Sequence, residues 1–168
     1  LTVTGSSSFT TTAGNAAITL DNASSYTGAV SLATNGTGNA TLTGVTSALN
    51  LGTSTIGGNA LISSAGAISD SGQVAVTGTS SFATTAGNAA ITLDFPAALT
   101  GTVTLAPNGT GNATLVNNTA TDLAGTTIGG NLSVSSTGAI TDAGALTRTR
   151  VGASLQAAEI RFLPYVRT

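Results

Sequence analysis

The chain has 168 residues, a length typical of one domain, but only 6% of them are charged, against roughly 25% in an ordinary soluble domain. The net charge of −2 provides no basic surface for nucleic acid, and no apolar run approaches the roughly 20 residues that a membrane-spanning helix needs. A hydrophobic content of 40% argues against intrinsic disorder, and the absence of a three-residue glycine period excludes collagen.

A long internal duplication organises the sequence. The octapeptide Asn35–Leu42 (Asn-Gly-Thr-Gly-Asn-Ala-Thr-Leu) recurs unchanged as Asn108–Leu115, 73 positions later. Phe9 and Phe82 share this offset, which becomes 72 after a one-residue deletion. A period of this length is typical of repeat architectures. We therefore divide one continuous solenoid domain into repeat 1 (residues 1–73), repeat 2 (74–145) and an atypical C-terminal tail or cap (146–168).

Within each repeat, apolar residues alternate with small polar ones. Ile18 and Leu20 are spaced by two, and so are Val30 and Leu32, which places each pair on one face of a β-strand. Stretches rich in Gly and Asn, such as residues 34–39, predict sharp turns between the strands. No segment before residue 150 has a sustained helical period, so we predict an all-β body.

Two all-β arrangements are compatible with short strands and frequent turns. An antiparallel sandwich needs two-residue hairpins, whereas a β-solenoid stacks coils of similar sequence. Repeat 1 divides into three coils, near residues 1–23, 24–47 and 48–73, so each coil has about 24 residues. Few bulky aromatics suit a narrow core. We predict a parallel β-helix (β-solenoid) with about three coils per 73-residue repeat, and six coils about 30 Å long.

Two motifs carry a resemblance to a known family. The segments Leu49–Asn59 and Ser63–Gly72, with their counterparts Leu123–Asn131 and Ser135–Gly144, resemble the repeats of filamentous-haemagglutinin-type adhesins. The resemblance covers about residues 1–147. It implies a right-handed parallel β-helix in a large exoprotein that Gram-negative bacteria export by two-partner secretion. It therefore implies a secreted protein, extracellular or at the bacterial cell surface.

The tail departs from the repeat. All the basic residues of the chain lie there, namely Arg148, Arg150, Arg161 and Arg167. Ser154 is a candidate N-cap for a short helix that runs through Ala158 to Leu163 and is stopped by Pro164, and alternatively Ile160 and Phe162 belong to a last strand. The tail is either a genuine cap or subunit joint, or else a natural terminus or a reading-frame artefact. The candidate cap or joint residues are Arg148, Arg150, Arg161, Phe162 and Tyr165.

The residues available for chemistry are few. Without His or Cys there is no His-activated nucleophile and no typical zinc site. Asp21 and Asp94 are repeat equivalents, as are Asp70 and Asp142, and we predict that they bond turn backbone rather than catalyse a reaction. The remaining carboxylates are Asp122 and Glu159. The polysaccharide lyases and hydrolases built on this fold need a cationic partner, and none precedes Arg148. We therefore predict no catalytic residue, metal site or cofactor.

Two sequence patterns concern the surface of the protein, Asn-x-Ser/Thr and Thr-x-Thr. Asn-x-Ser/Thr, the acceptor pattern for glycosylation, begins at Asn22, Asn35, Asn39, Asn108, Asn112, Asn117 and Asn131. Thr-x-Thr pairs such as Thr53 and Thr55 do not recur at a coil-length interval, which argues against a flat ice-binding array.

These observations favour a non-enzymatic extracellular role. The leading hypothesis is a rod-like shaft segment of a secreted bacterial adhesin, which binds a host-cell or surface receptor, a glycan or a protein. The alternative is a fibre or sheath subunit that polymerises end to end through its solenoid edges, because open strand edges pair readily. Such a subunit would be a homo-oligomer. Ice binding and carbohydrate-active enzymes rank below both.

Overall fold

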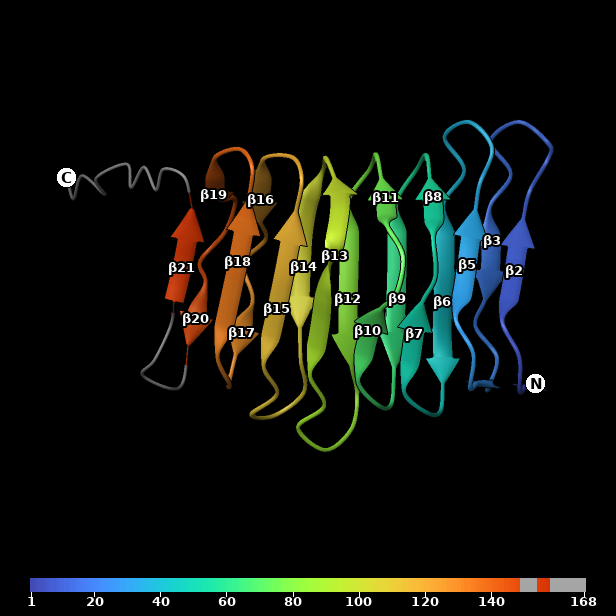
Figure 1. Ribbon diagram of the computed structural model, residues 1–168, viewed down its shortest axis with the longest axis horizontal. Coiled ribbons are helices and arrows are strands. Elements are labelled where there is room, and N and C mark those ends of the chain that lie inside the picture. The colour runs from blue at the N-terminus through green and yellow to red at the C-terminus, as the bar shows by residue number, and fades with distance from the viewer. Residues whose placement is uncertain (149–153, 158–168) are drawn as a thin grey trace.

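The computed structural model describes residues 1–148 and 154–157, and this part of the chain contains strands and turns but no helix. The chain winds as a β-solenoid of about seven turns, with strands lying side by side across the long axis (Figure 1). Strands of successive turns pair in parallel throughout this part, as β5 (Val30–Ala33) does with β2 (Ser7–Thr10). The predicted all-β class and parallel solenoid are confirmed.

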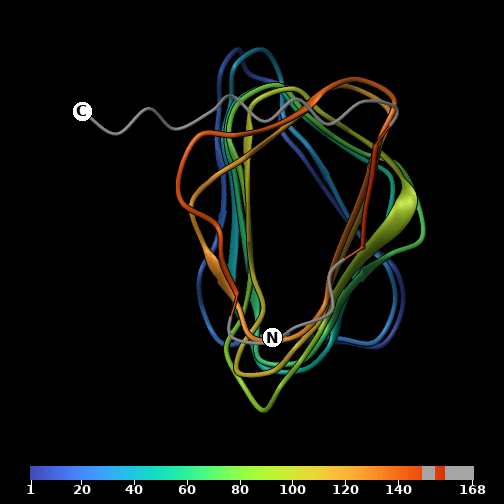
Figure 2. The ribbon, with the colours of Figure 1, turned by 90° about the vertical axis from the view of Figure 1, so that its left-hand side faces the viewer.

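Two large sheets form the main walls of the solenoid, and each turn contributes to both (Figures 1 and 2). Sheet I contains β2, β5, β7 (Leu49–Leu51), β8 (Ser54–Ile56), β10 (Ile68–Asp70), β11 (Val74–Val76), β13 (Ile91–Leu99), β15 (Ala113–Asn117), β18 (Leu132–Ser136) and β21 (Ser154–Ala157). Sheet II contains β3 (Ile18–Leu20), β6 (Ala40–Val45), β9 (Ala60–Ser64), β12 (Ser80–Thr84), β14 (Thr102–Ala106), β16 (Thr121–Leu123) and β19 (Ile140–Asp142). Two further pairs join β1 (Thr2–Val3) to β4 (Ser25–Tyr26), and β17 (Thr127–Ile128) to β20 (Thr147–Arg148).

The turns are shorter than the sequence suggested. Along one row of sheet I, Thr10 pairs with Ala33, Ala33 with Thr55, and Thr55 with Ala75. Each of these steps along the chain is shorter than the predicted coil of about 24 residues. The shorter steps explain why the chain makes about seven turns instead of the predicted six. One sequence repeat therefore covers more than three turns and fewer than four.

This mismatch moves repeat equivalents to different walls. Phe9 lies in β2 of sheet I, whereas Phe82 lies in β12 of sheet II. Ile18 lies in β3 of sheet II, and its equivalent Ile91 lies in β13 of sheet I. Repeat 2 is therefore rotated around the rod axis relative to repeat 1, although its sequence is nearly the same.

The core is a narrow column of side chains between the walls. Along each strand, buried residues alternate with more exposed ones, as expected when every second side chain points inward. Ile62, Phe82 and Leu105 stand opposite one another on three successive strands of sheet II. Each is at most 1% exposed, and burying a side chain of this size contributes about 1.5–3 kcal/mol.

The solenoid continues into the first part of the tail. β20 pairs with β17 and β21 pairs with β18, so the break expected after Thr147 is not a break in the stacking of these strands. Ser154 is the first residue of β21, so its predicted role as a helix N-cap is wrong. Arg148 ends β20. The other candidate cap or joint residues lie outside the described residues, namely Arg150, Arg161, Phe162 and Tyr165. Ile160, which the alternative prediction placed in a last strand with Phe162, also lies outside them.

The two repeat-equivalent phenylalanines provide a test of this core. Phe82→Ala should lower the free energy of unfolding by about 3–5 kcal/mol, because Phe82 is fully buried between two turns. Phe9→Ala should cost less, because Phe9 lies in the first turn and is only partly buried, with its ring edge against Tyr26. Urea unfolding of both variants measures the difference. Equal losses would contradict the assignment of Phe82 to the solenoid interior.

Candidate functional site

The carboxylates of the chain are placed at several points along the rod. Asp21 is exposed and accepts a hydrogen bond of 3.3 Å from Nδ2 of Asn22. Asp122 accepts bonds from the hydroxyls of Thr102 and Thr141, which lie on the preceding and following turns. Within residues 1–148 and 154–157, no three His, Cys, Asp or Glu side chains gather as a metal site.

Asp142 is exposed at the end of β19, while Asp70 and Asp94 lie beside each other on adjacent turns. Glu159 lies outside the described residues. In the described part of the chain, no helix is long and apolar enough to cross a membrane. Among the described carboxylates, Asp70 and Asp94 form the pair in which one carboxylate bonds the backbone of the other residue.

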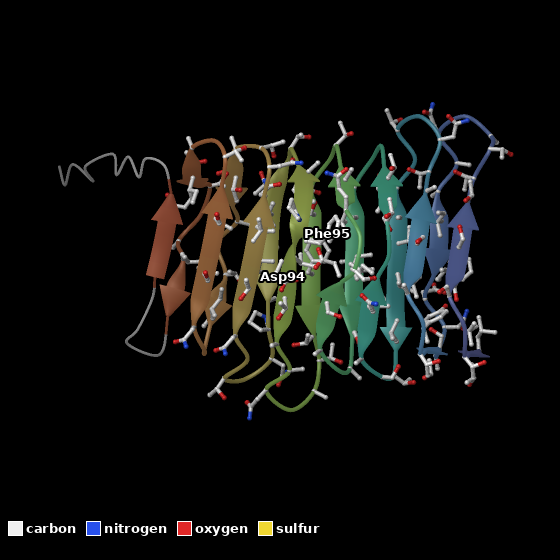
Figure 3. The ribbon with its side chains drawn as sticks, in the orientation of Figure 1. Asp94 and Phe95 are labelled. Carbon is white, nitrogen blue, oxygen red and sulfur yellow. The ribbon has the colours of Figure 1, made fainter. Side chains whose placement is uncertain are left out.

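A bulge in β13 creates these surroundings. Leu93 and Ala97 pair with Leu115 and Asn117 of β15, so three residues of β13 stand opposite one residue of its neighbour. These three residues, Asp94, Phe95 and Pro96, are all exposed. Proline has no N–H for the ladder, which is why it is tolerated at a bulge. Figure 3 shows Asp94 and Phe95 near the middle of the rod.

We call Asp70, Asp94, Phe95 and Pro96 the acidic bulge. Oδ1 of Asp70 accepts hydrogen bonds from the backbone N–H groups of Asp94 (3.1 Å) and Phe95 (3.2 Å). The amide of Gln73 donates to the carbonyl oxygen of Pro96 at 3.3 Å. Side chains of the preceding turn thus hold the bulge. Asp70 bonds backbone as predicted, but its donors lie in β13 of the following turn and not in the corner beside Asp70.

The ionised form of Asp70 is poorly solvated. Its Oδ2 is buried and has no hydrogen-bond partner in the described part of the chain. Burial raises the pKa of Asp70 above the ordinary value of 3.8, and the negative charge of Asp94 adds to this, while the N–H groups of Phe95 and Asp94 act in the opposite direction. The loss of hydration is the larger effect.

Phe95 gives the acidic bulge an apolar platform. Its side chain is 47% exposed, and in the described residues only Leu1 and Leu61 are comparably exposed among large hydrophobic side chains. Repeat 1 has Asn22 and Ala23 where repeat 2 has Phe95 and Pro96. Sequence reasoning paired Asp94 with Asp21 as a structural residue and missed this site. The available signal was the replacement of two small residues by Phe-Pro.

A stacked pair of loops in each repeat is a second surface feature, and the duplicated octapeptide contributes one loop of each pair. The loop pair of repeat 1 comprises residues 11–17 and 34–39, and that of repeat 2 comprises residues 85–90 and 107–112. Because the repeats occupy different walls, the two loop pairs project from opposite edges of the rod (Figure 1). Each repeat therefore presents the same loop pair in a different direction.

The loop pairs have matching internal bonds. Asn15 and Asn88 have φ angles of 61° and 59°, in the left-handed region that Asn tolerates. Oδ1 of Asn15 accepts the N–H of Thr37 at 2.8 Å, and Oδ1 of Asn88 accepts the N–H of Thr110 at 2.9 Å. The conformation of each loop pair is thus fixed by its own side chains.

The predicted glycosylation sites differ in accessibility. Asn117 is 1% exposed, and its amide bonds both the N–H and the carbonyl oxygen of Leu99, so it is unavailable to a modifying enzyme in the folded chain. Oδ1 of Asn39 accepts the N–H of Asn59 on the next turn. The exposed acceptors are Asn22, Asn35, Asn39, Asn108, Asn112 and Asn131.

A glycine substitution tests the close stacking beside the loops. A Cβ at Gly57 would overlap the carbonyl oxygen of Gly36 on the preceding turn, so Gly57→Ala should lower the free energy of unfolding by about 1–3 kcal/mol or more. Gly14→Ala is the matched control, because a Cβ there meets no atom within 4 Å. We expect Gly14→Ala to leave stability unchanged or raise it by up to about 1 kcal/mol. Thermal unfolding compares the two variants.

The buried carboxyl predicts a specific pH dependence. A raised pKa means that the folded state favours protonated Asp70. Protonation of Asp70 therefore stabilises the fold below about pH 3.8, and this stabilisation is lost as the pH rises through the folded-state pKa. Asp70→Asn removes the titration and keeps an oxygen for the two N–H groups. The variant should therefore gain stability relative to wild type between about pH 3 and about pH 7. Urea unfolding at several pH values measures this, and a constant difference would contradict it.

Comparison with known proteins identifies a repeat family. The chain matches a family described as repeats of unknown function (DUF5649) over residues 1–33, 37–106 and 110–160. The two gaps, residues 34–36 and 107–109, fall in the equivalent loops of the two repeats. The third match includes the first part of the tail. No curated protein and no solved structure matches the chain.

Proposed function

We propose that this chain, which belongs to the DUF5649 family of repeats, is a non-enzymatic structural segment of an extracellular rod. The observation that carries this proposal is the unbroken stacking of its turns. β9, for example, pairs with β6 on the preceding turn and with β12 on the following turn. The described turns thus connect one end of the rod to the other through pairing and a shared core.

The geometry suits a mechanical role. Neighbouring strands lie about 4.8 Å apart, so about seven turns hold the two ends of the segment about 34 Å apart. A force along the axis acts on the backbone hydrogen bonds of both walls together. The main specialised surface features, the acidic bulge and the two loop pairs, project from a frame of paired strands.

A finer proposal is that the rod is the shaft of a secreted, cell-surface bacterial adhesin. The support is the resemblance of Leu49–Asn59 and Leu123–Asn131 to filamentous-haemagglutinin-type repeats. In the fold, residues 49–59 form β7, β8 and the glycine corner after them, which are the elements of one turn. The same motif therefore serves as a stacking unit. A receptor would bind the surface loops or a part of the adhesin beyond this shaft.

The surroundings of the acids support a non-enzymatic role. Paired carboxylates catalyse hydrolysis when one donates a proton and the other stays free to act on the substrate. Oδ1 of Asp70 is instead engaged by two backbone N–H groups of the bulge, and Oδ2 is buried. This carboxyl is committed to holding β13.

A second candidate is a fibre subunit that stacks end to end. The outer edges of β1, β2 and β3 have no paired strand in the described structure. Leu1 is 70% exposed at this end, and Phe9 is only partly buried. An open edge beside apolar side chains would accept a further turn, whether that turn belongs to the same polypeptide or to another copy.

Electron microscopy across a concentration series distinguishes the two candidates. For a shaft segment, we expect isolated short rods at every concentration, because the stacking contacts lie within one chain. For a fibre subunit, we expect filaments that lengthen with concentration. Filaments would overturn the shaft proposal.

The adhesion component needs a binding measurement. Beads coated with the chain should attach to host cells in a saturable way if receptor-binding loops lie in this segment. Rods without attachment would keep the structural role and place adhesion outside this segment. Turnover of a polysaccharide that Asp94→Asn abolishes would contradict the non-enzymatic assignment.

A further inference from the structure

The strands that follow repeat 2 resume the repeat. β20 pairs with β17 in the register in which β11 pairs with β8, because Thr127 stands opposite Thr147 as Thr55 stands opposite Ala75. β21 pairs with β18 in the register in which β12 pairs with β9. Since β11 and β12 are themselves the equivalents of β1 and β2, β20 and β21 are the third copies of these two strands.

The junction between repeats 1 and 2 shows which strands stack on which. One turn of repeat 1, formed by β8, β9 and β10, pairs with β11, β12 and β13 of the next turn. The equivalents of the first three strands are β17, β18 and β19, and those of the second three are β1, β2 and β3, at the other end of the rod (Figure 1). Ile68 stands opposite Ile91 at this junction, and their equivalents Ile140 and Ile18 lie in β19 and β3. The two ends of the rod therefore carry the two halves of one junction.

An asparagine side chain crosses this junction. Oδ1 of Asn59 accepts the N–H of Thr79 on the following turn at 2.9 Å. The equivalent of Asn59 in repeat 2 is Asn131, and the equivalent of Thr79 near the start of the rod is Ser6. Asn131 and Ser6 are both exposed. The same hydrogen bond could thus form between the C-terminal end of one rod and the N-terminal end of another.

An aspartate side chain crosses the junction at a second point. Oδ1 of Asp70 accepts the N–H of Asp94 at 3.1 Å. The equivalents of these two residues are Asp142 and Asp21, which are exposed at opposite ends of the rod. Side-chain acceptors on one end and backbone donors on the other are thus arranged as they are inside the chain.

We propose that the edge formed by β17, β18 and β19 fits β1, β2 and β3 of a second copy of this chain, and that β20 and β21 are a cap that fills two of these three places. The outer edges of β1, β2, β3 and β19 have no paired strand in the described structure, whereas β17 and β18 carry the cap. Because β1, β2 and β3 form one turn, β3 of a second copy cannot reach β19 while the cap is in place. This inference rests on the proposed structural role of the stacked turns, and it adds a device that limits the length of the rod.

Proline substitutions in the full-length chain test the cap. Neighbouring N–H groups of a strand point to opposite sides, so a proline pair removes one N–H that faces the paired strand. Thr147→Pro with Arg148→Pro and Leu155→Pro with Gln156→Pro should therefore release β20 and β21. We expect the molar mass from light scattering to rise from 16.0 kDa, that of one chain, to multiples that grow with concentration. Alanine at the same four positions keeps the N–H groups and should leave a single chain.

Cysteine pairs test the register of the contact between copies, since the chain has no Cys. Ser69 stands opposite Thr92 at the internal junction, and their equivalents are Thr141 and Thr19. Thr141→Cys with Thr19→Cys, added to the proline variant, should give a ladder of disulfide-linked chains on oxidation. Thr141→Cys with Thr41→Cys is the matched control. Thr41 lies one strand beyond Thr19, about 10 Å from position 141 of the other copy, whereas a disulfide joins Cα atoms at most about 7 Å apart.

Three outcomes would overturn the proposal. The first is a proline variant that stays a single chain while hydrogen-exchange protection of the Phe82 amide shows a folded interior, and this result would leave the proposed structural role intact. The second is equal linking by the two cysteine pairs, which would show contact between copies in another register. The third is filament formation by the unchanged chain, which would also overturn the shaft proposal.

Discussion

Close contact between the backbones of successive turns is the constraint on which the rest of this structure depends. Parallel strands about 4.8 Å apart leave no space for a side chain where two corners stack, so Gly57 lies directly against the carbonyl of Gly36. The same contact recurs in repeat 2 between Gly129 and Gly109. Glycine at these corners lets the ladder continue, and the ladder in turn aligns the apolar residues of the core.

The length of a turn and the length of the sequence repeat are set independently. The number of residues in a turn is set by strand pairing and varies along the rod. The step from Thr10 to its partner Ala33 contains more residues than the step from Thr121 to its partner Ile140. The repeat is set by duplication of the sequence. Because the repeat is not a whole number of turns, an identical octapeptide occupies opposite edges of the rod. A long array of such units would present its loops in several directions around one axis.

Most of the fold could be predicted because apolar alternation and Gly-Asn corners are local signals. The alternation of Val30 and Leu32 identified a strand whose inward residues are fully buried. The number of turns could not be predicted, because pairing register depends on how many residues each corner needs. The helix expected after Ser154 failed for a related reason, since pairing of β21 with β18 outweighs a local capping preference. The acidic bulge was missed because Asp94 was interpreted through its equivalent, Asp21.

The acidic bulge shows how a repeat acquires a site without losing its frame. The ladder between β13 and β15 resumes at Ala97 and Asn117, so the three residues of the bulge change the surface while the core row continues. Asp70 supports this bulge because its carboxylate accepts hydrogen bonds from the N–H groups of Asp94 and Phe95, which stand outside the regular ladder with β15. That arrangement costs Asp70 some of its hydration and places a second negative charge beside it. Repeat 1 lacks the aromatic residue at this position, so the two similar units share one architecture and differ in the surface that they present.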